Sequence, residues 1–419
     1  MRMPTPPRGS GELAHRSAFA SATYRHYFPS AVFSTLGSWL LRFLLGWSAW
    51  ELTESATWVG VVAGLTLAPA LVLSPLFGIV TDRINPRNGL LLTIALHALF
   101  SGIAGVLVAA DLFNLSALLV LAAALGVTTS AHTPIRLALV PLLVPRQSLP
   151  SAIGYSAMVF NTSRILGPAL GAWILTQTSS AWAYGCAAGL MLVAMPSLWD
   201  TRVAPPLRQR PQDIGFRQQL RAGLRYTAGH EMIRLVFGFT LINALLGRTV
   251  IELLPAVSGV LLQGDSATLA TLTAAAGAGS IIGGLVVSRQ GGGHRRLLRL
   301  LALSLVVSAL LVLALAGAGD LQVAAGLVGL LSMAATMAGT SSQALAQLVV
   351  DDSYRGRVLS LWTMVAMGAP AVGAMAMGGL VDWLSFPVVL PGFALVCAVA
   401  TAVLYLIGQP ERDNRGNPA

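Results

Sequence analysis

Long apolar runs, separated by short polar or Pro/Gly-rich clusters, follow one another along almost the whole chain. Each run has about 20 residues, the length that a helix needs to cross a hydrocarbon core of about 30 Å. The runs do not alternate apolar and polar residues, as the strands of a membrane barrel would. The pattern predicts twelve transmembrane helices, near residues 28–50, 57–80, 88–110, 115–138, 151–176, 181–200, 234–260, 267–288, 297–318, 321–348, 356–380 and 386–408.

A polar stretch lies between the sixth and the seventh predicted helix. It contains Phe216, Leu220 and Leu224 at four-residue spacing among Arg and Gln residues. This spacing predicts an amphipathic helix on the inner membrane surface, and it leaves open whether that helix is a tether or has a regulatory role. The predicted order is a tail (1–24), a six-helix bundle (25–200), a linker (201–233), a second six-helix bundle (234–408) and a tail (409–419).

The composition supports this interpretation. Of 419 residues, 55% are hydrophobic and only 10% are charged, and the mean hydropathy is +0.73. Soluble domains carry about 25% charged residues, so we expect an all-α integral membrane protein. The chain has Arg but no Lys, which argues against a P-loop or a Lys Schiff base. Cys186 and Cys397 lie in apolar runs and are expected to be small buried side chains.

The arginines lie in alternate connections between the predicted helices. All but three lie in the tails, in connections 2–3, 4–5, 6–7, 8–9 and 10–11, or at the helix ends that border them, whereas the opposite connections carry acids: Glu51, Glu54, Asp111, Asp265, Asp320 and Asp382. This positive-inside pattern predicts that both termini are cytoplasmic, as an even number of spans requires. Membrane orientation thus accounts for the net charge of +10, and we expect no nucleic-acid partner.

The two halves of the chain resemble each other at one fixed offset. "GIVTDR" begins at Gly78 and "GLVVSR" at Gly284, and 284 − 78 = 206. Arg42 in the first predicted helix and Arg248 in the seventh are related by the same offset, since 248 − 42 = 206. Parallel repeats of this kind form transporters whose substrate site lies between the halves near the membrane midplane. We therefore predict two pseudo-symmetric bundles with an arginine from each half near the centre.

Few charges lie well inside the predicted helices: Arg42, Arg164, Arg248 and Glu252. Arg248 and Glu252 are four residues apart and can pair on one helix face, in which case Arg42 and Arg164 lack acidic partners. The surplus of positive charge favours an anionic or polyhydroxylated ligand, although nearby Trp residues also suit a flat aromatic drug. The expected substrate-binding residues are Arg42, Arg248, Arg164, Asn161, Asn243 and Trp39.

Proton coupling requires a group that titrates. Glu252 is the best candidate, because it is a carboxylate in a low-dielectric region beside a cation. His97 and His132 are weaker candidates. The histidines are dispersed and no HExxH or GxSxG motif is present, so we expect no metal, no cofactor and no enzyme activity.

Three motifs carry a resemblance to the major facilitator superfamily, in its drug:proton antiporter branch, which includes enterobactin exporters and macrolide efflux proteins. They are "GIVTDRINPR" from Gly78, "NTSRILGPALGAW" from Asn161, and "VPRQSLPSA" with its counterpart "DDSYRGRVLS". The resemblance implies a cytoplasmic gate formed by Gly78, Asp82, Arg83, Arg87, Arg355 and Arg357. It also implies close helix packing at Gly167, Pro168 and Gly171.

The function that follows is secondary active transport by alternating access. We expect a monomer in a bacterial inner membrane that exports a small organic molecule in exchange for protons, with an anionic metabolite such as a siderophore as the leading substrate. The alternatives are a broad drug or macrolide efflux pump and a lysolipid flippase on the same fold. The expected partners are the substrate, protons and the lipid bilayer.

Overall fold

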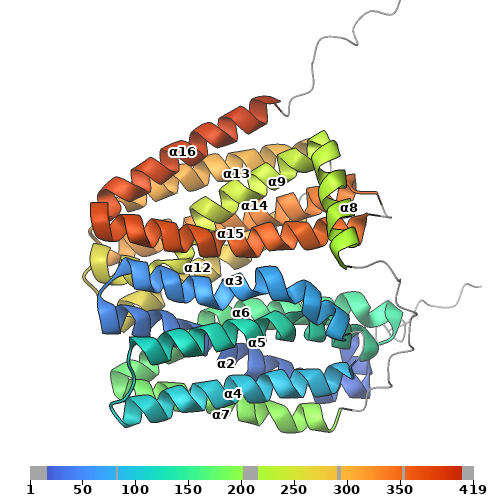
Figure 1. Ribbon diagram of the computed structural model, residues 1–419, viewed down its shortest axis with the longest axis vertical. Helices are drawn as coiled ribbons and strands as arrows, with labels where there is room; N and C mark the ends of the chain where they lie inside the picture. The colour runs from blue at the N-terminus through green and yellow to red at the C-terminus, as the bar shows by residue number, and fades with distance from the viewer. Residues whose placement is uncertain (1–16, 82–83, 202–215, 290–293, 352–353, 408–419) are drawn as a thin grey trace, which may run out of the picture.

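The computed structural model describes residues 17–81, 84–201, 216–289, 294–351 and 354–407, and every regular element in these ranges is helical (Figure 1). The N-terminal half contains α2 (Ala22–Thr53), α3 (Ala56–Thr81), α4 (Pro86–Ala109), α5 (Leu115–Leu139), α6 (Leu149–Gln177) and α7 (Ser180–Trp199). Short 3-10 turns accompany them: η1 (Ala18–Ala20), η2 (Val140–Leu142) and η3 (Arg146–Ser148). The predicted linker contains α8 (Phe216–Gly229).

The C-terminal half begins with a helix that is interrupted several times. Its parts are α9 (Glu231–Asn243), the π turn η4 (Ala244–Arg248), α10 (Thr249–Glu252), α11 (Leu254–Ala256) and the π turn η5 (Val257–Leu261). It is followed by α12 (Ser266–Arg289), α13 (His294–Leu315), α14 (Leu321–Val349), α15 (Arg355–Leu384) and α16 (Phe386–Ile407).

The seventh predicted helix, at 234–260, is therefore not continuous. Pro255 explains one interruption, because proline has no N–H and its ring clashes with the carbonyl four residues earlier. Both π turns flank this position, and single π turns inside helices are frequent at functional sites. The equivalent helix of the first half, α2, is uninterrupted over 32 residues.

Short polar side chains begin several helices. Asn85 Oδ1 accepts a hydrogen bond from the first turn of α4, where Pro86 occupies the first position. Asn114 and Asp320 cap α5 and α14 in the same way. These caps satisfy N–H groups that a helix cannot pair internally, which matters most in a membrane, where water is scarce.

The two halves pack against each other in a symmetric pattern (Figure 1). In the first half α5 packs on α3 and α4, and in the second half α14 packs on α12 and α13. Across the interface α3 runs antiparallel to α15, and α6 packs on α12. We call the end at which α3 stops, α15 starts and α8 lies the linker end, and the end at which α2 stops and α3 starts the distal end.

Within the described residues, ten helices are long and apolar enough to cross a membrane, and a shorter apolar stretch, Ala56–Ala70, belongs to α3. α6 carries the polar residues Asn161–Arg164 near its centre. Large apolar side chains such as Val106, Leu395 and Leu406 are exposed, as expected for contact with lipid. Each of the twelve predicted ranges overlaps one helix, with the interrupted seventh counted as one, and the largest overrun is at 297–318, since α13 ends at Leu315.

Candidate functional site

Arg42 and Glu252 form an ion pair between the two halves. Nη2 of Arg42, on α2, donates a hydrogen bond to Oε2 of Glu252, on α10. The Arg42 side chain is 36% exposed and the Glu252 side chain 14% exposed, so the pair is partly desolvated. A lone charge inside a membrane costs at least about 2.5–3.5 kcal/mol, and each partner lowers that cost for the other.

The Trp39 ring contacts two guanidinium groups from different helices. Cζ of Arg42 lies 5.7 Å and Cζ of Arg164 lies 5.9 Å from its centroid, within the range of cation–π interactions. The Phe160 ring meets Trp39 edge-on, with 5.4 Å between the centroids. The aromatic face thus helps to position both cations.

Arg164 connects α6 to two helices of the other half. Nη1 donates a hydrogen bond to Oγ of Ser280 at 2.7 Å, and Nη2 donates one to Oγ of Ser332 at 3.1 Å. Both serines are buried, and the Ser280 hydroxyl also lies 2.8 Å from Oγ1 of Thr336. The planar fork of arginine suits this two-point contact, which a lysine would not reproduce.

Arg248 does not take the partner that its spacing suggested. Among the described residues its guanidinium has no hydrogen bond or ion pair within 4 Å, although it interacts electrostatically with Glu252 and Arg42. The segment that follows Arg248, Thr249–Glu252, is regular α-helix, yet Glu252 contacts Arg42 of the opposite half instead. Arg42 therefore has an acidic partner after all, supplied by the opposite half.

The centre of the interface holds an excess of positive charge. Arg42, Arg164, Arg248 and Glu252 are close enough to interact electrostatically, and they comprise three guanidinium groups and one carboxylate. In a low-dielectric environment such an excess creates a field that attracts anions. The surplus of positive charge therefore favours a negatively charged group at this centre.

The two predicted asparagines are also present near this centre. Nδ2 of Asn243 donates a hydrogen bond to the carbonyl of Ala335 at 3.1 Å. Its Oδ1 is buried and has no partner within the described part of the chain. A buried acceptor without a donor costs about 1–3 kcal/mol, so a hydroxyl or N–H group that reached this oxygen would recover that free energy. Asn161 lies three residues before Arg164 on α6 and is partly buried.

Close packing brings Arg164 alongside α2. A Cβ atom at Gly167 would lie 2.7 Å from Cβ of Trp39, and one at Gly171 would lie 2.6 Å from Cδ1 of Phe43. Pro168 lies between them inside α6. Residues with side chains at these glycines would push α6 away from α2 and separate Arg164 from the Trp39 ring.

Most of the predicted cytoplasmic gate lies outside what the structure describes: Asp82 and Arg83 are not described, nor are the surroundings of Gly78 or the side chains of Arg355 and Arg357. Arg87 is described. Its Nε donates a hydrogen bond to the carbonyl of Leu198 at 3.1 Å, and its Nη2 donates one to the carbonyl of Trp199. Arg87 thus satisfies the last carbonyls of α7 within its own half, and its part in a gate stays a prediction.

His97 and His132 form a separate polar cluster, with 5.6 Å between their ring centroids. Nδ1 of His97 donates a hydrogen bond to the Thr93 carbonyl at 2.7 Å, and its Nε2 lies 3.3 Å from Oγ1 of Thr129. Nδ1 of His132 lies 2.9 Å from Oγ1 of Thr93. These contacts stay within α4 and α5, away from the Arg42–Glu252 pair.

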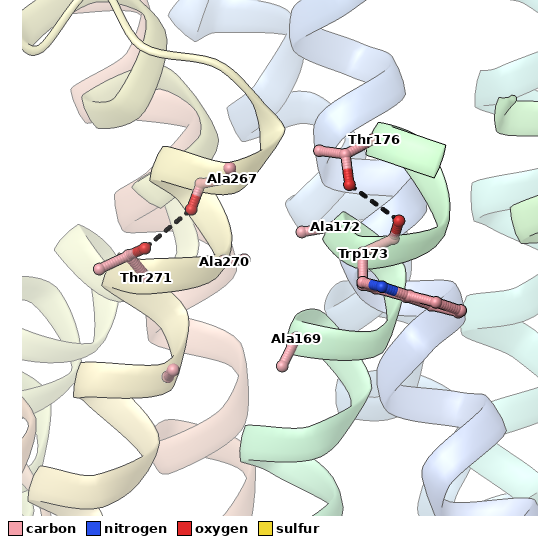
Figure 2. Close-up of a pocket in the computed structure, with 8 residues that line it drawn as sticks. Ala169, Ala172, Trp173, Thr176, Ala267, Ala270 and Thr271 are labelled. Atoms are coloured by element: carbon pink, nitrogen blue, oxygen red, sulfur yellow. Dashed lines mark hydrogen bonds between the residues drawn. The ribbon is translucent and has the colours of Figure 1, made fainter. Parts of the chain in front are cut away.

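A cavity of about 280 Å³ lies between α6 and α12 toward the distal end (Figure 2). It is lined by Ala169, Ala172, Trp173, Thr176, Ala267, Ala270, Thr271 and Ala274. On both helices the lining residues lie to the distal side of the Arg164–Ser280 contact. The cavity therefore continues the same helix interface outward from the charged centre.

Sequence reasoning missed Ser280 and Ser332 as partners of Arg164, and Thr336 as a partner of Ser280. Single hydroxyls in apolar helices carry no distinctive signal, because most of them bond to a carbonyl of their own helix. The only hint in the sequence is that the N–H groups of Arg164 need hydrogen-bond acceptors somewhere in the membrane interior.

The fold and its charged centre define a membrane transporter built from two helical bundles. Residues 14–418 match the transmembrane secretion effector family of the major facilitator superfamily, so the chain belongs to this family of transporters and is an integral membrane protein, not an enzyme. The resemblance inferred from the three motifs is confirmed.

Similar proteins include siderophore transporters. The chain is 24% identical over 404 residues to the staphyloferrin A transporter of Staphylococcus aureus, covering 94% of this chain and 99% of that protein. It is 27% identical over 340 residues to the enterobactin exporter of Escherichia coli O1:K1, covering 79% of this chain and 78% of that protein. The protein is thus distantly related to siderophore exporters.

Solved structures show the same fold. A mutant of the nucleoside transporter NupG matches with a TM-score of 0.72 and 14% identity, covering 92% of this chain and 100% of that chain. A bacterial homologue of the lysosomal transporter Spinster, in an inward-facing and unoccupied conformation, matches with a TM-score of 0.66 and 15% identity over 92% of this chain and 96% of that chain. These identities are low, so the comparison establishes the fold alone.

Proposed function

We propose that the protein exports an anionic organic metabolite of the siderophore class in exchange for protons. The observation that carries this proposal is the charge balance of the centre, where three guanidinium groups face one carboxylate at the interface of the halves. Carboxylate or catecholate oxygens match the planar donor fork of arginine. The relatives named as a staphyloferrin A transporter and an enterobactin exporter support this substrate class, and the second also supports the outward direction.

The Arg42–Glu252 pair gives a physical basis for obligatory exchange. Because the pair joins the two halves, it opposes the rocking motion that alternates access. An anionic substrate can break the pair by taking Arg42, and a proton can break it by neutralising Glu252. Without substrate or proton the ion pair stays intact and the two halves cannot rock. The transporter therefore changes to the outward-facing state with substrate bound and returns to the inward-facing state with a proton bound.

Arg248 is the proposed first contact of the substrate. Its guanidinium has no ion-pair partner within the described residues, so an anion can bind it before Arg42 is released from Glu252. Oδ1 of Asn243 accepts a hydrogen bond from a hydroxyl of the substrate, and Trp39 presents its face to an aromatic or aliphatic part. Arg164 is held by Ser280 and Ser332 and positions Trp39.

The proposed topology has twelve spans, with α3 and α6 added to the ten apolar helices, and with the linker end in the cytoplasm of a bacterial inner membrane. Arginines at the linker end support this orientation, among them Arg225, Arg295 and Arg299, which are exposed. α3 and α6 have lengths of 26 and 29 residues, sufficient to cross a bilayer.

Purified protein in proteoliposomes tests the proposal. Iron-free enterobactin and staphyloferrin A serve as anionic probes, with ethidium and a lysophospholipid as comparators, and transport is driven by a pH gradient. We expect transport of an anionic probe, at least about a tenfold loss in Arg248→Ala, and no change in Arg295→Ala, an arginine exposed at the linker end. Transport of ethidium alone, unaffected by Arg248→Ala, would instead indicate a drug efflux pump.

A further inference from the structure

The carboxylate of Asp382 lies on the N-terminus of α3, although Asp382 belongs to the last turn of α15 in the other half. Oδ1 accepts a hydrogen bond from the backbone N–H of Ala56 at 2.8 Å, and Oδ2 accepts one from the N–H of Thr57 at 2.9 Å. The hydroxyl of Ser55 donates a further hydrogen bond to Oδ2. An acid from one bundle therefore caps a helix of the other, where the free N–H groups and the helix dipole favour a negative charge.

The helices behind this cap touch backbone to backbone. A Cβ atom at Gly378 would clash with the carbonyl oxygen of Ala56, and one at Gly60 would clash with that of Ala374. α3 and α15 thus meet at van der Waals distance over their distal halves. A small separation of the two helices would break the three hydrogen bonds of Asp382, because hydrogen bonds weaken steeply beyond about 3.2 Å.

At the pseudo-equivalent interface, between α6 and α12, no acid of the described residues bridges the two halves at the distal end; Asp265 bonds the first turn of α12 from the residue just before that helix. The offset of 206 relates Asp382 to Thr176, since 382 − 206 = 176. The Thr176 hydroxyl donates a hydrogen bond to the Trp173 carbonyl of its own helix, and the Thr271 hydroxyl donates one to the Ala267 carbonyl of α12 (Figure 2). The cavity of about 280 Å³ separates these residues. At the distal end, Asp382 thus connects α3 to α15, and no acid of the described residues connects α6 to α12 in the same way.

Asp382 is exposed, unlike the serines that hold Arg164. Its carboxylate can be hydrated as soon as it leaves α3, and the N–H groups of Ala56 and Thr57 can be hydrated as well. The three hydrogen bonds favour the arrangement in which the helices touch, yet the contact breaks without burying an unpaired charge. These are the properties of a reversible contact rather than of a permanent structural one.

We propose that Asp382 is a latch that holds the distal ends of α3 and α15 together and must leave the α3 N-terminus before the distal side opens. This inference rests on the alternating access of the proposed function, but not on the identity of the substrate. In the transport cycle the latch sets the fraction of empty transporter that is closed on the distal side.

Distances between spin labels in substrate-free protein test the latch. The two native cysteines, Cys186 and Cys397, are first replaced by Ala. One pair of labels is attached to Leu112→Cys and Gly319→Cys at the distal end, and a second pair, in a separate variant, to Asp200→Cys and Gln347→Cys at the linker end. All four labelled positions are exposed. Asp382→Asn keeps the shape of the side chain and removes its charge. We expect the ratio of long to short distal distances to rise about tenfold, while the linker-end distances shorten.

Ser55→Ala removes one of the three hydrogen bonds and should shift the same ratio in the same direction by a smaller factor. Asp111→Asn, an exposed acid of the distal end, is the matched control and should leave both distances unchanged. Unchanged distal distances in Asp382→Asn, or longer distances at both ends, would overturn the latch. If Asp382→Asn failed to fold, unchanged distal distances in Ser55→Ala would also overturn the latch. Because no substrate is present, these outcomes are independent of the transport assay.

Discussion

Arg42 of the first half pairs with Glu252 of the second, although Arg248 lies on the same membrane-crossing segment as Glu252 and only four residues away. The ion pair therefore acts between the bundles rather than within one of them. Its rupture is coupled to the relative movement of the halves, which a pair inside one helix would not be. This geometry is the reason that we propose Glu252 as the residue that couples protonation to conformation.

Replacing Glu252 with Gln should uncouple transport from the proton gradient. The amide neither titrates nor pairs with Arg42 as an ion, so the lock between the halves is released permanently. We expect efflux of the substrate from proteoliposomes to lose its stimulation by a pH gradient, at least about tenfold, while exchange of labelled for unlabelled substrate continues. Efflux measured with and without the gradient checks this.

Glu231→Gln is the matched control, because Glu231 is an exposed acid in the first turn of α9 on the same segment. It should leave coupling unchanged. If Glu252→Gln retained full stimulation by the gradient, the coupling carboxylate would have to be sought elsewhere.

Arg164→Lys should lower the stability of the protein although it conserves the charge. An ammonium group cannot donate to Ser280 and Ser332 with the geometry of the guanidinium fork, so at least one of the two hydrogen bonds is lost. Hydrogen bonds to charged groups contribute about 1.5–3 kcal/mol each, and the loss should appear as a lower unfolding temperature in detergent. Arg295→Lys, at an exposed position, should unfold at the wild-type temperature.

Two glycines of α6 should respond in opposite ways to replacement by alanine. At Gly167 the new Cβ would lie 2.7 Å from Cβ of Trp39 and 2.9 Å from the backbone nitrogen of Leu40, and we expect a loss of about 1–3 kcal/mol from overpacking. At Gly154 a Cβ would meet nothing within 4 Å, so alanine should be neutral or stabilising because it favours the helix. Thermal unfolding of both variants decides this, and equal unfolding temperatures would contradict the proposed close contact of α6 with α2.

Asp265 should make stability depend on pH in the acidic range. The backbone N–H of Thr268 donates a hydrogen bond to its carboxylate at 3.0 Å and holds the pKa of that carboxyl below the ordinary value of 3.8. A lowered pKa in the folded state stabilises the protein above pH 3.8, and this contribution is lost as the pH falls through the pKa of the folded state. Asp265→Ala should therefore cost about 0.5–2 kcal/mol at neutral pH.

Unfolding temperatures of the wild type and of Asp265→Ala, measured from neutral pH to below pH 3.8, check this expectation. The difference between them should shrink at the acidic end. Asp200→Ala, at an exposed residue that follows α7, should show no such convergence. A difference that persisted unchanged at low pH would mean that Asp265 stabilises α12 by packing rather than by its charge.

The sequence predicted the ranges of the helices, because apolar runs and polar breaks are local properties of the chain. It also identified Arg42, Arg164 and Arg248 as unusual, since a cation inside an apolar run is visible without any structure. It did not reveal the interruptions of the seventh helix, although Pro255 was a local signal for one of them. Asp382 was assigned to a connection, whereas it lies in the last turn of α15 and caps α3.

By itself, the sequence determined the family, the all-helical membrane architecture and the presence of surplus positive charge between two related halves. Only the tertiary structure decided which charges meet: Glu252 with Arg42, Arg164 with Ser280 and Ser332, and Asp382 with the N-terminus of α3. The physical reason is that hydrophobic runs act along one helix, whereas ion pairs and caps depend on the angle and register at which different helices pack. The packing angle and register depend on the contacts of small residues across the interface, so they cannot be derived from any single segment of the chain.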